Sequence, residues 1–349
     1  MRIVLFHPVM LPPVDYGGVE RVVLWLAKGL VELGHEVWIG AQEGSRLPPT
    51  LRLLPFSAGA RRVRDLISVL PPGTDMVHFH APPESAEIDH LPCPWILTVH
   101  GNGKRGEEFP WNTVFLTQDH ANRHGAQCFV FNGIDPSEYL FAPETKTRDF
   151  VFLSKTSWNV KNVEGAIRLC RKAGVRLRVA GGNRPWGPRL RSWFSPSINW
   201  VGPVAGASKA ALLSRAQGLV FPVRWPEPFG LVMVEAMMSG TPVLGPWVGS
   251  VPEILQGEMG FPPEEVPVKV MGGRCIGQSG SRVTEFETEW VDSLRKGFEL
   301  ADFERARSWA MQRYHYIEMA KAYLDAYTRV RSGERLNSRK PLSKGWQIQ

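Results

Sequence analysis

The chain contains few cysteines and no long apolar run. Its 349 residues include 4 cysteines, whose spacing fits neither a C-x-x-C metal motif nor a disulfide framework. No uninterrupted apolar stretch reaches the roughly 20 residues that a membrane-spanning helix needs, and the opening residues MRIVLFHPVM lack the layout of a signal peptide. We therefore expect a cytoplasmic protein with reduced cysteines at Cys93, Cys128, Cys170 and Cys275.

Acidic residues are outnumbered by basic ones. The chain has 34 Asp and Glu against 41 Lys and Arg, a formal net charge of +7. This balance favours anionic partners such as sugar nucleotides, phospholipid head groups and anionic glycans. No nucleic-acid-binding motif accompanies the charge, so we expect no nucleic acid partner. The positive charge also motivates a weaker hypothesis, peripheral contact with an anionic membrane at its inner face.

The order of predicted strands and helices indicates an α/β protein with two domains. The strand RIVLF, a breaker-rich segment, a helix with apolar periodicity and the strand HEVWIG form a β-loop-α-β unit, which implies a parallel sheet. The alternation restarts after the turn-rich loop 131–149, so we expect two Rossmann-like domains in tandem. Residues 256–285 resist periodic assignment. The predicted segments are domains 1–143 and 144–310, a terminal helix 311–332 and a flexible tail 333–349.

One glycine-rich segment matches a dinucleotide-binding fingerprint without its context. GNGKRG at 101–106 fits G-x-G-x-x-G and follows the predicted strand PWILTVH. The fingerprint requires a helix next, but the β-rich run EEFPWNTVFLT follows. We therefore predict a turn-forming loop. The missing fingerprint, together with the lack of a suitably placed Tyr-x-x-x-Lys pair, makes an oxidoreductase or epimerase the less favoured alternative.

Two glutamates bracket an apolar run in WPEPFGLVMVEAMMSGTPV, residues 225–243. On one regular helix Glu227 and Glu235 would lie about 80° and two turns apart, too far to share a proton or a metal ion. Pro228 suits the first helical position, so we predict that Glu227 ends a loop and that a helix begins behind it. The alternative is an amphipathic helix with a capping acid and one solvated glutamate. A helix start here would offer an anion the N–H groups around Phe229, Gly230 and Leu231.

With FPVRWPEPFGLVMVEAMMSGTPVLG as its strongest segment, the chain resembles the family 4 retaining glycosyltransferases, which have the GT-B fold. The resemblance covers most of residues 1–255 and the terminal helix, and this segment carries the family's E-x7-E motif. It implies a nucleoside-diphosphate sugar donor bound between two facing Rossmann-like domains, and an acceptor held mostly by the first. It also implies no required metal ion and a last helix that returns to the first domain. By position, Glu227 would contact hydroxyls of the transferred sugar, and Glu235 would bind the ribose hydroxyls.

Other segments carry further parts of the resemblance. VFLSKTSWNVKNVEGAI looks like the family segment that neutralises the diphosphate, through Lys161 and, at the family's arginine position, Lys155. His100 matches the family's histidine near the donor sugar and the reaction centre. The remaining matches are a glycine loop at the diphosphate, Gly17 and Gly18, and a nucleobase-binding turn, Gly202 and Val204. The histidines of VHFH, His78 and His80, alternate on a strand and share a face, which by itself favours core or edge positions.

These observations predict a retaining, metal-independent glycosyltransferase. It would move a hexose or similar sugar from a UDP or GDP sugar to a hydroxyl of a carbohydrate, lipid-linked or small-molecule acceptor. No residue is an obvious nucleophile for a double displacement, so attack on the same face, assisted by the leaving diphosphate, is the favoured mechanism. A noncatalytic protein that binds sugar nucleotides or glycans is the principal alternative, and would show neither donor hydrolysis nor transfer.

Overall fold

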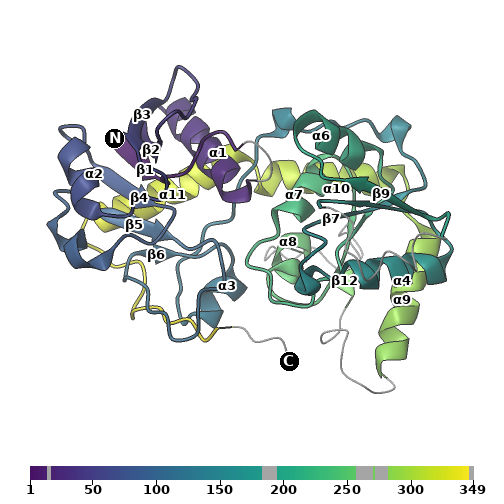
Figure 1. Cartoon of the computed structure of the whole chain (residues 1–349). Helices are drawn as coiled ribbons and strands as arrows, with labels where there is room; N and C mark the ends of the chain where they lie inside the picture. The colour runs from purple at the N-terminus through teal and green to yellow at the C-terminus, as the bar shows by residue number, and fades with distance from the viewer. Residues whose placement is uncertain (14–16, 183–194, 257–269, 272–281, 346–349) are drawn as a thin grey trace. The chain divides into compact units, whose positions relative to one another are not determined.

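The computed structural model describes the chain except residues 14–16, 183–194, 257–269, 272–281 and 346–349 (Figure 1). Its contacts divide the chain into two compact units, one formed by Met1–Asp135 with the described residues from Tyr314 onward, and the other by Pro136–Arg313. The division at residues 135 and 136 lies several residues before the expected boundary, because the turn at Pro143–Thr145 packs within the second unit.

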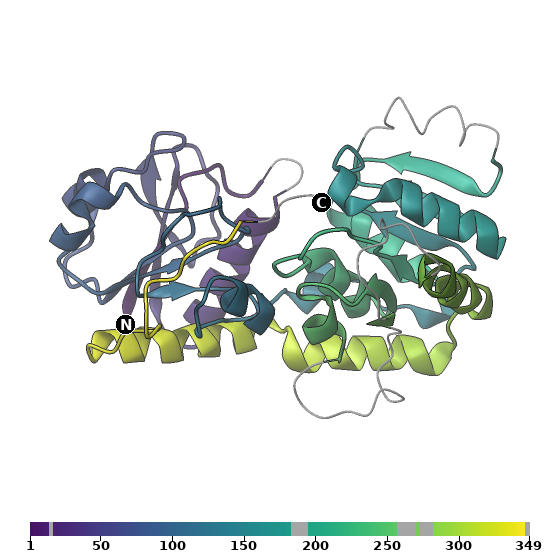
Figure 2. The ribbon, with the colours of Figure 1, turned by 90° about the horizontal axis from the view of Figure 1, so that it is seen from below.

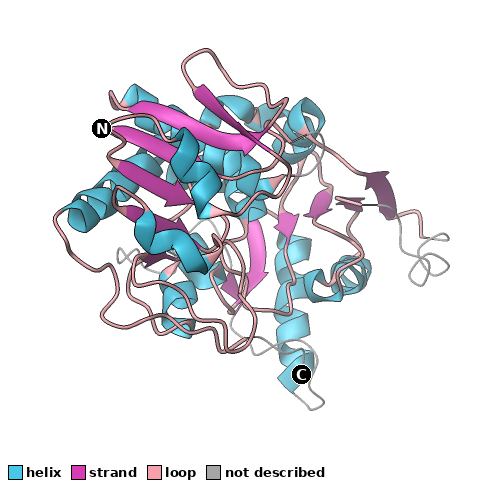
Figure 3. Cartoon of the chain, turned by 60° about the vertical axis from the view of Figure 1, so that its left-hand side comes forward, coloured by secondary structure: helices cyan, strands magenta, loops and turns pink. Residues whose placement is uncertain are grey.

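The first unit is a parallel sheet with helices against it (Figures 1 and 3). Its six strands lie in the order β3-β2-β1-β4-β5-β6, an arrangement that places the carboxyl ends of all strands at one edge. The elements are β1 (Arg2–Phe6), α1 (Gly18–Glu32), β2 (Glu36–Gln42), β3 (Arg52–Phe56), α2 (Val63–Val69), β4 (Met76–Phe79), η1 (Ser85–His90), β5 (Trp95–Thr98), β6 (Thr113–Val114), α3 (Gln118–Arg123) and α11 (Tyr316–Arg331).

Helix α11 is part of this first unit, although all of Pro136–Arg313, which forms the second unit, separates it from the rest of the first in the sequence. Figure 2 shows it in yellow along the sheet, and it packs against α1. Close approach is possible because Gly29 has no Cβ, which would lie 2.8 Å from the Cβ of Ala320. The loop expected at 101–106 is confirmed, since the described structure there contains turns and no helix.

The second unit repeats the design, with six parallel strands in the order β12-β11-β10-β7-β8-β9. Buried residues of β7, β8 and α4 form its core with Trp290 and Leu294 of α9. The elements are η2 (Pro136–Glu138), η3 (Pro143–Thr145), β7 (Phe150–Leu153), η4 (Asn159–Lys161), α4 (Val163–Ala173), β8 (Leu177–Ala180), β9 (Ile198–Gly202), α6 (Gly206–Arg215), β10 (Leu219–Val220), α7 (Leu231–Met238), β11 (Val243–Pro246), α8 (Val251–Gln256), β12 (Val270–Met271), α9 (Arg282–Lys296) and α10 (Leu300–Arg313). The predicted fold class, two α/β units built on parallel sheets, is confirmed.

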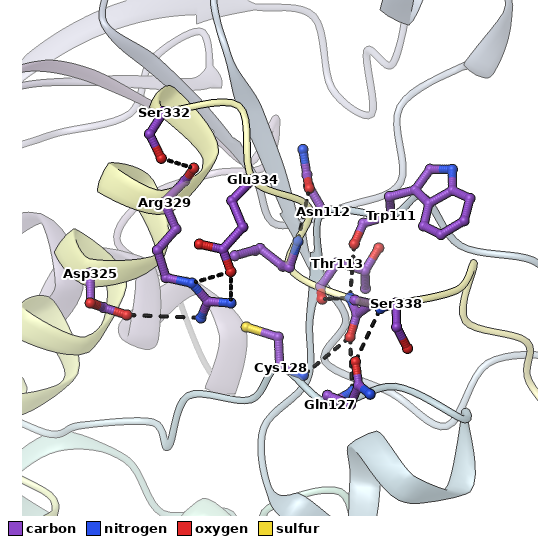
Figure 4. A network of polar contacts seen from close by, with 12 residues as sticks. Trp111, Asn112, Thr113, Gln127, Cys128, Asp325, Arg329, Ser332, Glu334 and Ser338 are labelled. Atoms are coloured by element: carbon purple, nitrogen blue, oxygen red, sulfur yellow. Dashed lines mark hydrogen bonds and ion pairs between the residues drawn. The ribbon is translucent and has the colours of Figure 1, made fainter.

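The prediction of a flexible tail at 333–349 is wrong as far as Gly345. After α11 the chain runs back along the first unit, where Leu342 forms an antiparallel bridge with Glu108. The side chain of Asn337, only 1% exposed, accepts hydrogen bonds from the N–H groups of Gln127 and Cys128 and donates to the carbonyls of Trp111 and Thr113. Figure 4 shows the polar network around these residues. The bridge and the buried amide thus hold a segment whose composition resembles that of a disordered tail.

Replacement of Asn337 by alanine is expected to lower the free energy of unfolding by about 2–4 kcal/mol, since it leaves four backbone groups of the sheet edge without partners. Urea unfolding measures the loss. Ser338→Ala is the matched control, because Ser338 is exposed and contributes its backbone N–H to Gln127; we expect a change within about 0.5 kcal/mol. Equal stability of the two variants would contradict a structural role for the tail.

Candidate active site

A buried ion pair in the second unit joins two of the predicted site residues. Lys161, at the end of η4, places its Nζ 2.5 Å from Oε2 of Glu227, which lies in the loop between β10 and α7. The indole of Trp225 donates to the same carboxylate oxygen at 2.7 Å. The two charged side chains are only 12% and 10% exposed. Such a pair is held in one geometry, because each partner offsets the buried charge of the other.

The backbone around Glu227 is fixed from a distant part of the chain. Ser250 donates its N–H to the Glu227 carbonyl at 3.0 Å, and its hydroxyl donates to the carbonyl of Phe229 at 2.9 Å. Gly249 has φ +59°, and a Cβ there would lie 2.5 Å from the Glu227 nitrogen. Only glycine allows this approach, so the segment that follows β11 sets the position of the Glu227 loop.

Asn162 fixes Lys161 from the other side, and the sequence analysis missed this residue. Its backbone is left-handed, with φ 60° and ψ 49°, and its side-chain oxygen caps α4 by accepting from the N–H of Gly165 at 3.0 Å. Its amide also donates to the carbonyl of Pro222 at 2.8 Å. The asparagine therefore ties the η4 turn to the end of β10, next to the loop that carries Glu227. An asparagine directly before an amphipathic helix is the signal that could have identified it.

Helix α7 begins later than expected. Pro228 does not occupy the first helical position: α7 spans Leu231–Met238, with Gly230 at its N-cap in a left-handed conformation, φ 79°. A Cβ on Gly230 would lie 2.7 Å from Met233 and 3.2 Å from Cγ of Glu227, so glycine keeps this approach open. The Phe229 side chain is buried in the core, 2% exposed. Of the three predicted anion contacts, Gly230 and Leu231 lie at the helix start. The side chain of Phe229 is buried, so only its backbone could contact a ligand.

Glu235 lies one turn into α7 and forms a second buried ion pair. Its Oε1 accepts from Nζ of Lys209, on α6, at 2.6 Å and from the hydroxyl of Tyr139 at 2.9 Å. Glu235 is 5% exposed and Lys209 is 8% exposed. The sequence analysis missed both partners. A lysine among the apolar positions of the helix pattern SKAALLSR is the signal for Lys209, because a buried ammonium needs a carboxylate.

Two aromatic rings, those of Trp158 and Trp225, connect Lys155 to the Lys161–Glu227 ion pair. The exposed side chain of Lys155 places Nζ 4.8 Å from the centroid of the Trp158 ring, and Trp158 meets Trp225 edge to face at 6.2 Å. Trp225 in turn lies 4.9 Å from Nζ of Lys161. The two predicted phosphate-binding lysines thus stand at the ends of one aromatic row, and Lys161 contacts a carboxylate of the predicted motif.

The predicted base-binding residues follow the edge strand β9. Gly202 ends this strand with φ +84°, and its carbonyl oxygen accepts a hydrogen bond from the N–H of Gly181 at 3.1 Å. Val204 is half-buried in the turn before α6. A positive φ at Gly202 turns the chain away from the sheet and leaves backbone groups of the turn at its carboxyl edge.

The other predicted residues belong to the first unit. Gly17 is the N-cap of α1, and Gly18 is its first residue. A Cβ on Gly17 would lie 2.4 Å from the Cβ of Pro13, so a larger residue cannot occupy this turn without a shift. His100 follows β5 and lies 3.1 Å from His80, between Nε2 and Nδ1. The expected burial of His78 and His80 is confirmed, at 0% and 4% exposure.

Buried histidines make the stability of this unit sensitive to acid. Burial lowers the pKa of His7 from 6.5 to about 4, and it lowers the pKa values of His78 and His80 well below 6.5. Below pH 6.5 the unfolded chain therefore binds protons that the folded chain does not, so stability rises with pH in this window and is lost as the pH falls. We expect the free energy of unfolding to drop by about 1.4 kcal/mol per pH unit for each such histidine. Urea titrations at several pH values between 7 and 5 measure it; a constant midpoint would contradict the expectation.

Comparison with known proteins shows which of them share this architecture. The model of the family "Glycosyl transferases group 1" matches residues 147–268. A crystal structure of AviGT4, a glycosyltransferase involved in avilamycin A biosynthesis, is similar with a TM-score of 0.73 and 23% identity, over 95% of this chain and 98% of that one. The catalytic domain of starch synthase IV from Arabidopsis thaliana, bound to ADP and acarbose, gives a TM-score of 0.72 and 12% identity over 95% and 99%. The fold is therefore that of the GT-B glycosyltransferases.

A relative of known activity matches part of the sequence. Glycogen synthase of Mycobacterium tuberculosis is 31% identical over 144 residues, which are 38% of this chain and 34% of the relative. The chain thus matches about a third of the length of the curated relatives. The predicted resemblance to GT-B glycosyltransferases is confirmed by the family model and by the fold. Among the described residues, no helix is both long and apolar enough to cross a membrane.

Proposed function

We propose that the chain is a retaining glycosyltransferase that moves a hexose or similar sugar from a nucleoside-diphosphate sugar to an acceptor hydroxyl. The acceptor would be a glycan, a glycolipid or a secondary metabolite. The observation that carries the proposal is the buried Lys161–Glu227 pair in the loops beside the N-terminus of α7. A cation and free helix N–H groups suit a diphosphate, and a neighbouring carboxylate suits sugar hydroxyls.

Similar structures support the choice of donor class. HepE of Anabaena, with a TM-score of 0.63 and 14% identity over 94% of this chain and 99% of that one, was solved in complex with UDP-glucose. The starch synthase structure holds ADP. In our proposal the bond between the anomeric carbon and the diphosphate oxygen breaks while the acceptor oxygen bonds to the same face. The acceptor proton passes to the departing diphosphate, whose growing charge Lys161 stabilises.

A thermal-shift panel of UDP, GDP, ADP and their sugar conjugates tests the proposal. A ligand of the folded state raises the apparent melting temperature in proportion to the logarithm of its concentration above Kd. We expect one nucleoside diphosphate and its sugar conjugate to stabilise the protein, and slow hydrolysis of that donor to follow. Donor binding without hydrolysis or transfer, with any acceptor extract, would favour a noncatalytic binding protein. No stabilisation by any member of the panel would overturn the proposal.

We further propose that transfer requires no divalent metal ion, because Lys161 and the start of α7 would supply the positive charge at the diphosphate. Activity is expected to persist, within about twofold, in excess chelator, because the positive charge of Lys161 belongs to the chain and a chelator cannot remove it. The assay compares initial rates before and after chelation with rates after magnesium or manganese is added back. Loss of activity that a divalent ion restores would refute this part of the proposal.

A further inference from the structure

Three histidines stand together at the carboxyl edge of the first sheet. His7 follows β1, His80 follows β4 and His100 follows β5 by two residues, and these strands are neighbours in the sheet. The backbone fixes their order, because His80 donates its N–H to the Phe6 carbonyl at 3.0 Å and His7 donates to that of Gly40 at 2.8 Å. We call this group the histidine edge. All three residues belong to one unit.

Two members of the histidine edge have ring nitrogens that are buried without partners. Among the described residues, none forms a hydrogen bond with Nδ1 or Nε2 of His7 or with Nε2 of His80. His7 is 8% exposed and His80 is 4% exposed, while their ring centroids lie 6.4 Å apart. A buried polar group without a partner costs about 1–3 kcal/mol. Buried nitrogens without partners are typical of a site where a polar ligand supplies the missing hydrogen bonds.

Other buried histidines of the same unit are fully paired. His78 contacts the Tyr327 hydroxyl at 2.8 Å and the Thr98 hydroxyl at 2.7 Å. His124 contacts the carbonyls of His120 and Asn102 at 2.8 and 3.0 Å. The fold therefore supplies two partners to histidines with a packing role. His7 and His80 differ from them in this respect, although all four residues belong to the same unit.

The charge and protonation of the imidazole rings determine which kind of ligand the histidine edge can bind. Burial lowers the pKa of His7 to about 4 and that of His100 to about 3, so at neutral pH these imidazoles carry no charge that would offset an anion. The contact between Nδ1 of His80 and Nε2 of His100 needs one proton. If His80 donates it, Nε2 of His80 accepts from a ligand; if His100 donates it, Nε2 of His80 donates. A hydroxyl group suits both states, because it donates and accepts.

We propose that His7 and His80, the latter oriented by its contact with His100, form a binding site for uncharged hydroxyl groups, and that this site holds a neutral polyhydroxylated acceptor in preference to a phosphorylated or carboxylated one. The inference rests on the proposed function and names the substrate class of its acceptor side. A metal ion is not the favoured occupant, since the described residues contain no group of three His, Cys, Asp or Glu side chains arranged to hold one.

The test measures acceptor binding apart from donor chemistry. The probes are methyl α-glucoside and methyl α-mannoside, with glucose 6-phosphate and glucuronic acid as their charged counterparts. Imidazole NMR signals of histidine-labelled protein, assigned with single variants, report binding directly. We expect the neutral glycosides to shift the signals of His7 and His80, and the charged sugars to shift them less. Signals that no neutral glycoside moves at saturation would mean that water alone serves these nitrogens, and would overturn the proposal.

Variants give a second readout. His7→Leu should lower acceptor kcat/KM by about 10- to 100-fold, mainly through KM, because a ligand hydroxyl loses its partner. Donor hydrolysis and nucleoside diphosphate affinity should stay within about twofold, since His7 would serve the acceptor alone. His7→Gln keeps an amide near the imidazole nitrogen and should restore part of the loss. His35→Leu is the matched control, because His35 precedes β2 at the amino edge of the same sheet.

The outcomes separate this inference from the proposed function. Wild-type protein that neither binds nor hydrolyses any nucleotide sugar would refute the glycosyltransferase proposal, whereas the NMR titration with glycosides would still decide the histidine edge. Intact donor hydrolysis with equal acceptor KM in His7→Leu and His35→Leu would refute the histidine edge alone. A preference for charged sugars in the folded wild-type protein would do the same.

Discussion

Replacement of Lys161 by alanine is expected to lower turnover by about 10²- to 10³-fold, the usual loss when a preorganised group that stabilises developing charge is removed. In the structure Nζ of Lys161 is held 2.5 Å from Glu227 and is only 12% exposed. A lysine held in this way needs little reorganisation when negative charge grows on a leaving diphosphate. Steady-state kinetics with saturating donor measure the effect on kcat. Unchanged kcat in a folded variant would remove Lys161 from the site.

The same substitution also affects folding, so the two effects need separation. Lys161→Ala leaves the Glu227 carboxylate buried without its cation, which costs about 3–5 kcal/mol. In the double variant Lys161→Met with Glu227→Gln, neither charge remains and the stability should largely return while turnover does not. Lys321→Ala is the matched control for the loss of a lysine, since its partner Glu318 lies one turn away on the exposed face of α11. We expect it to change stability by about 1 kcal/mol or less.

Local patterns explain why the fold could be predicted. The strands of both sheets are short apolar runs bounded by turn formers, such as RIVLF and DFVFL, and the helices between them have apolar periodicity. These signals are contained in a few consecutive residues. The start of α7 was misplaced because Pro228 is compatible both with a first helical turn and with the loop in which it lies. The left-handed Gly230, not the proline, begins the helix.

The site could be predicted only in part, because its partners are distant in the sequence. Lys161 and Glu227 were found through a motif, but Asn162 reaches Pro222 across 60 residues and Lys209 reaches Glu235 across 26. No local pattern contains such pairs. The tail was mispredicted because a local signal was present but incorrect: its charged, turn-rich composition is typical of disordered segments. The buried side chain of Asn337 and the backbone hydrogen bonds of Pro341, Leu342 and Ser343 hold this segment, and all of them reach residues distant in the sequence.

The two glutamates of the α7 segment are matched in their surroundings, which makes their roles separable by experiment. Each carboxylate accepts from one lysine, at 2.5 Å for Glu227 and 2.6 Å for Glu235. The Trp225 indole also donates a neutral hydrogen bond to Glu227, and the Tyr139 hydroxyl donates one to Glu235. Their exposures, 8% and 5%, are similar. Neutralising either one should therefore have a similar cost to the fold, so a difference in function reports what each side chain contacts in the ligand.

We expect Glu227→Gln to reduce turnover by about 100-fold and to leave the affinity for the bare nucleoside diphosphate nearly intact, because its proposed partners are sugar hydroxyls that move as the anomeric centre flattens. Glu235→Gln should instead weaken the nucleoside diphosphate by about 10-fold and raise the donor KM, since ribose is held equally in the ground and transition states. Calorimetry with the nucleoside diphosphate alone distinguishes them. Equal losses of affinity in both variants, or a larger loss for Glu227→Gln, would mean that Glu227 and Glu235 do not bind the sugar and the ribose of the donor separately.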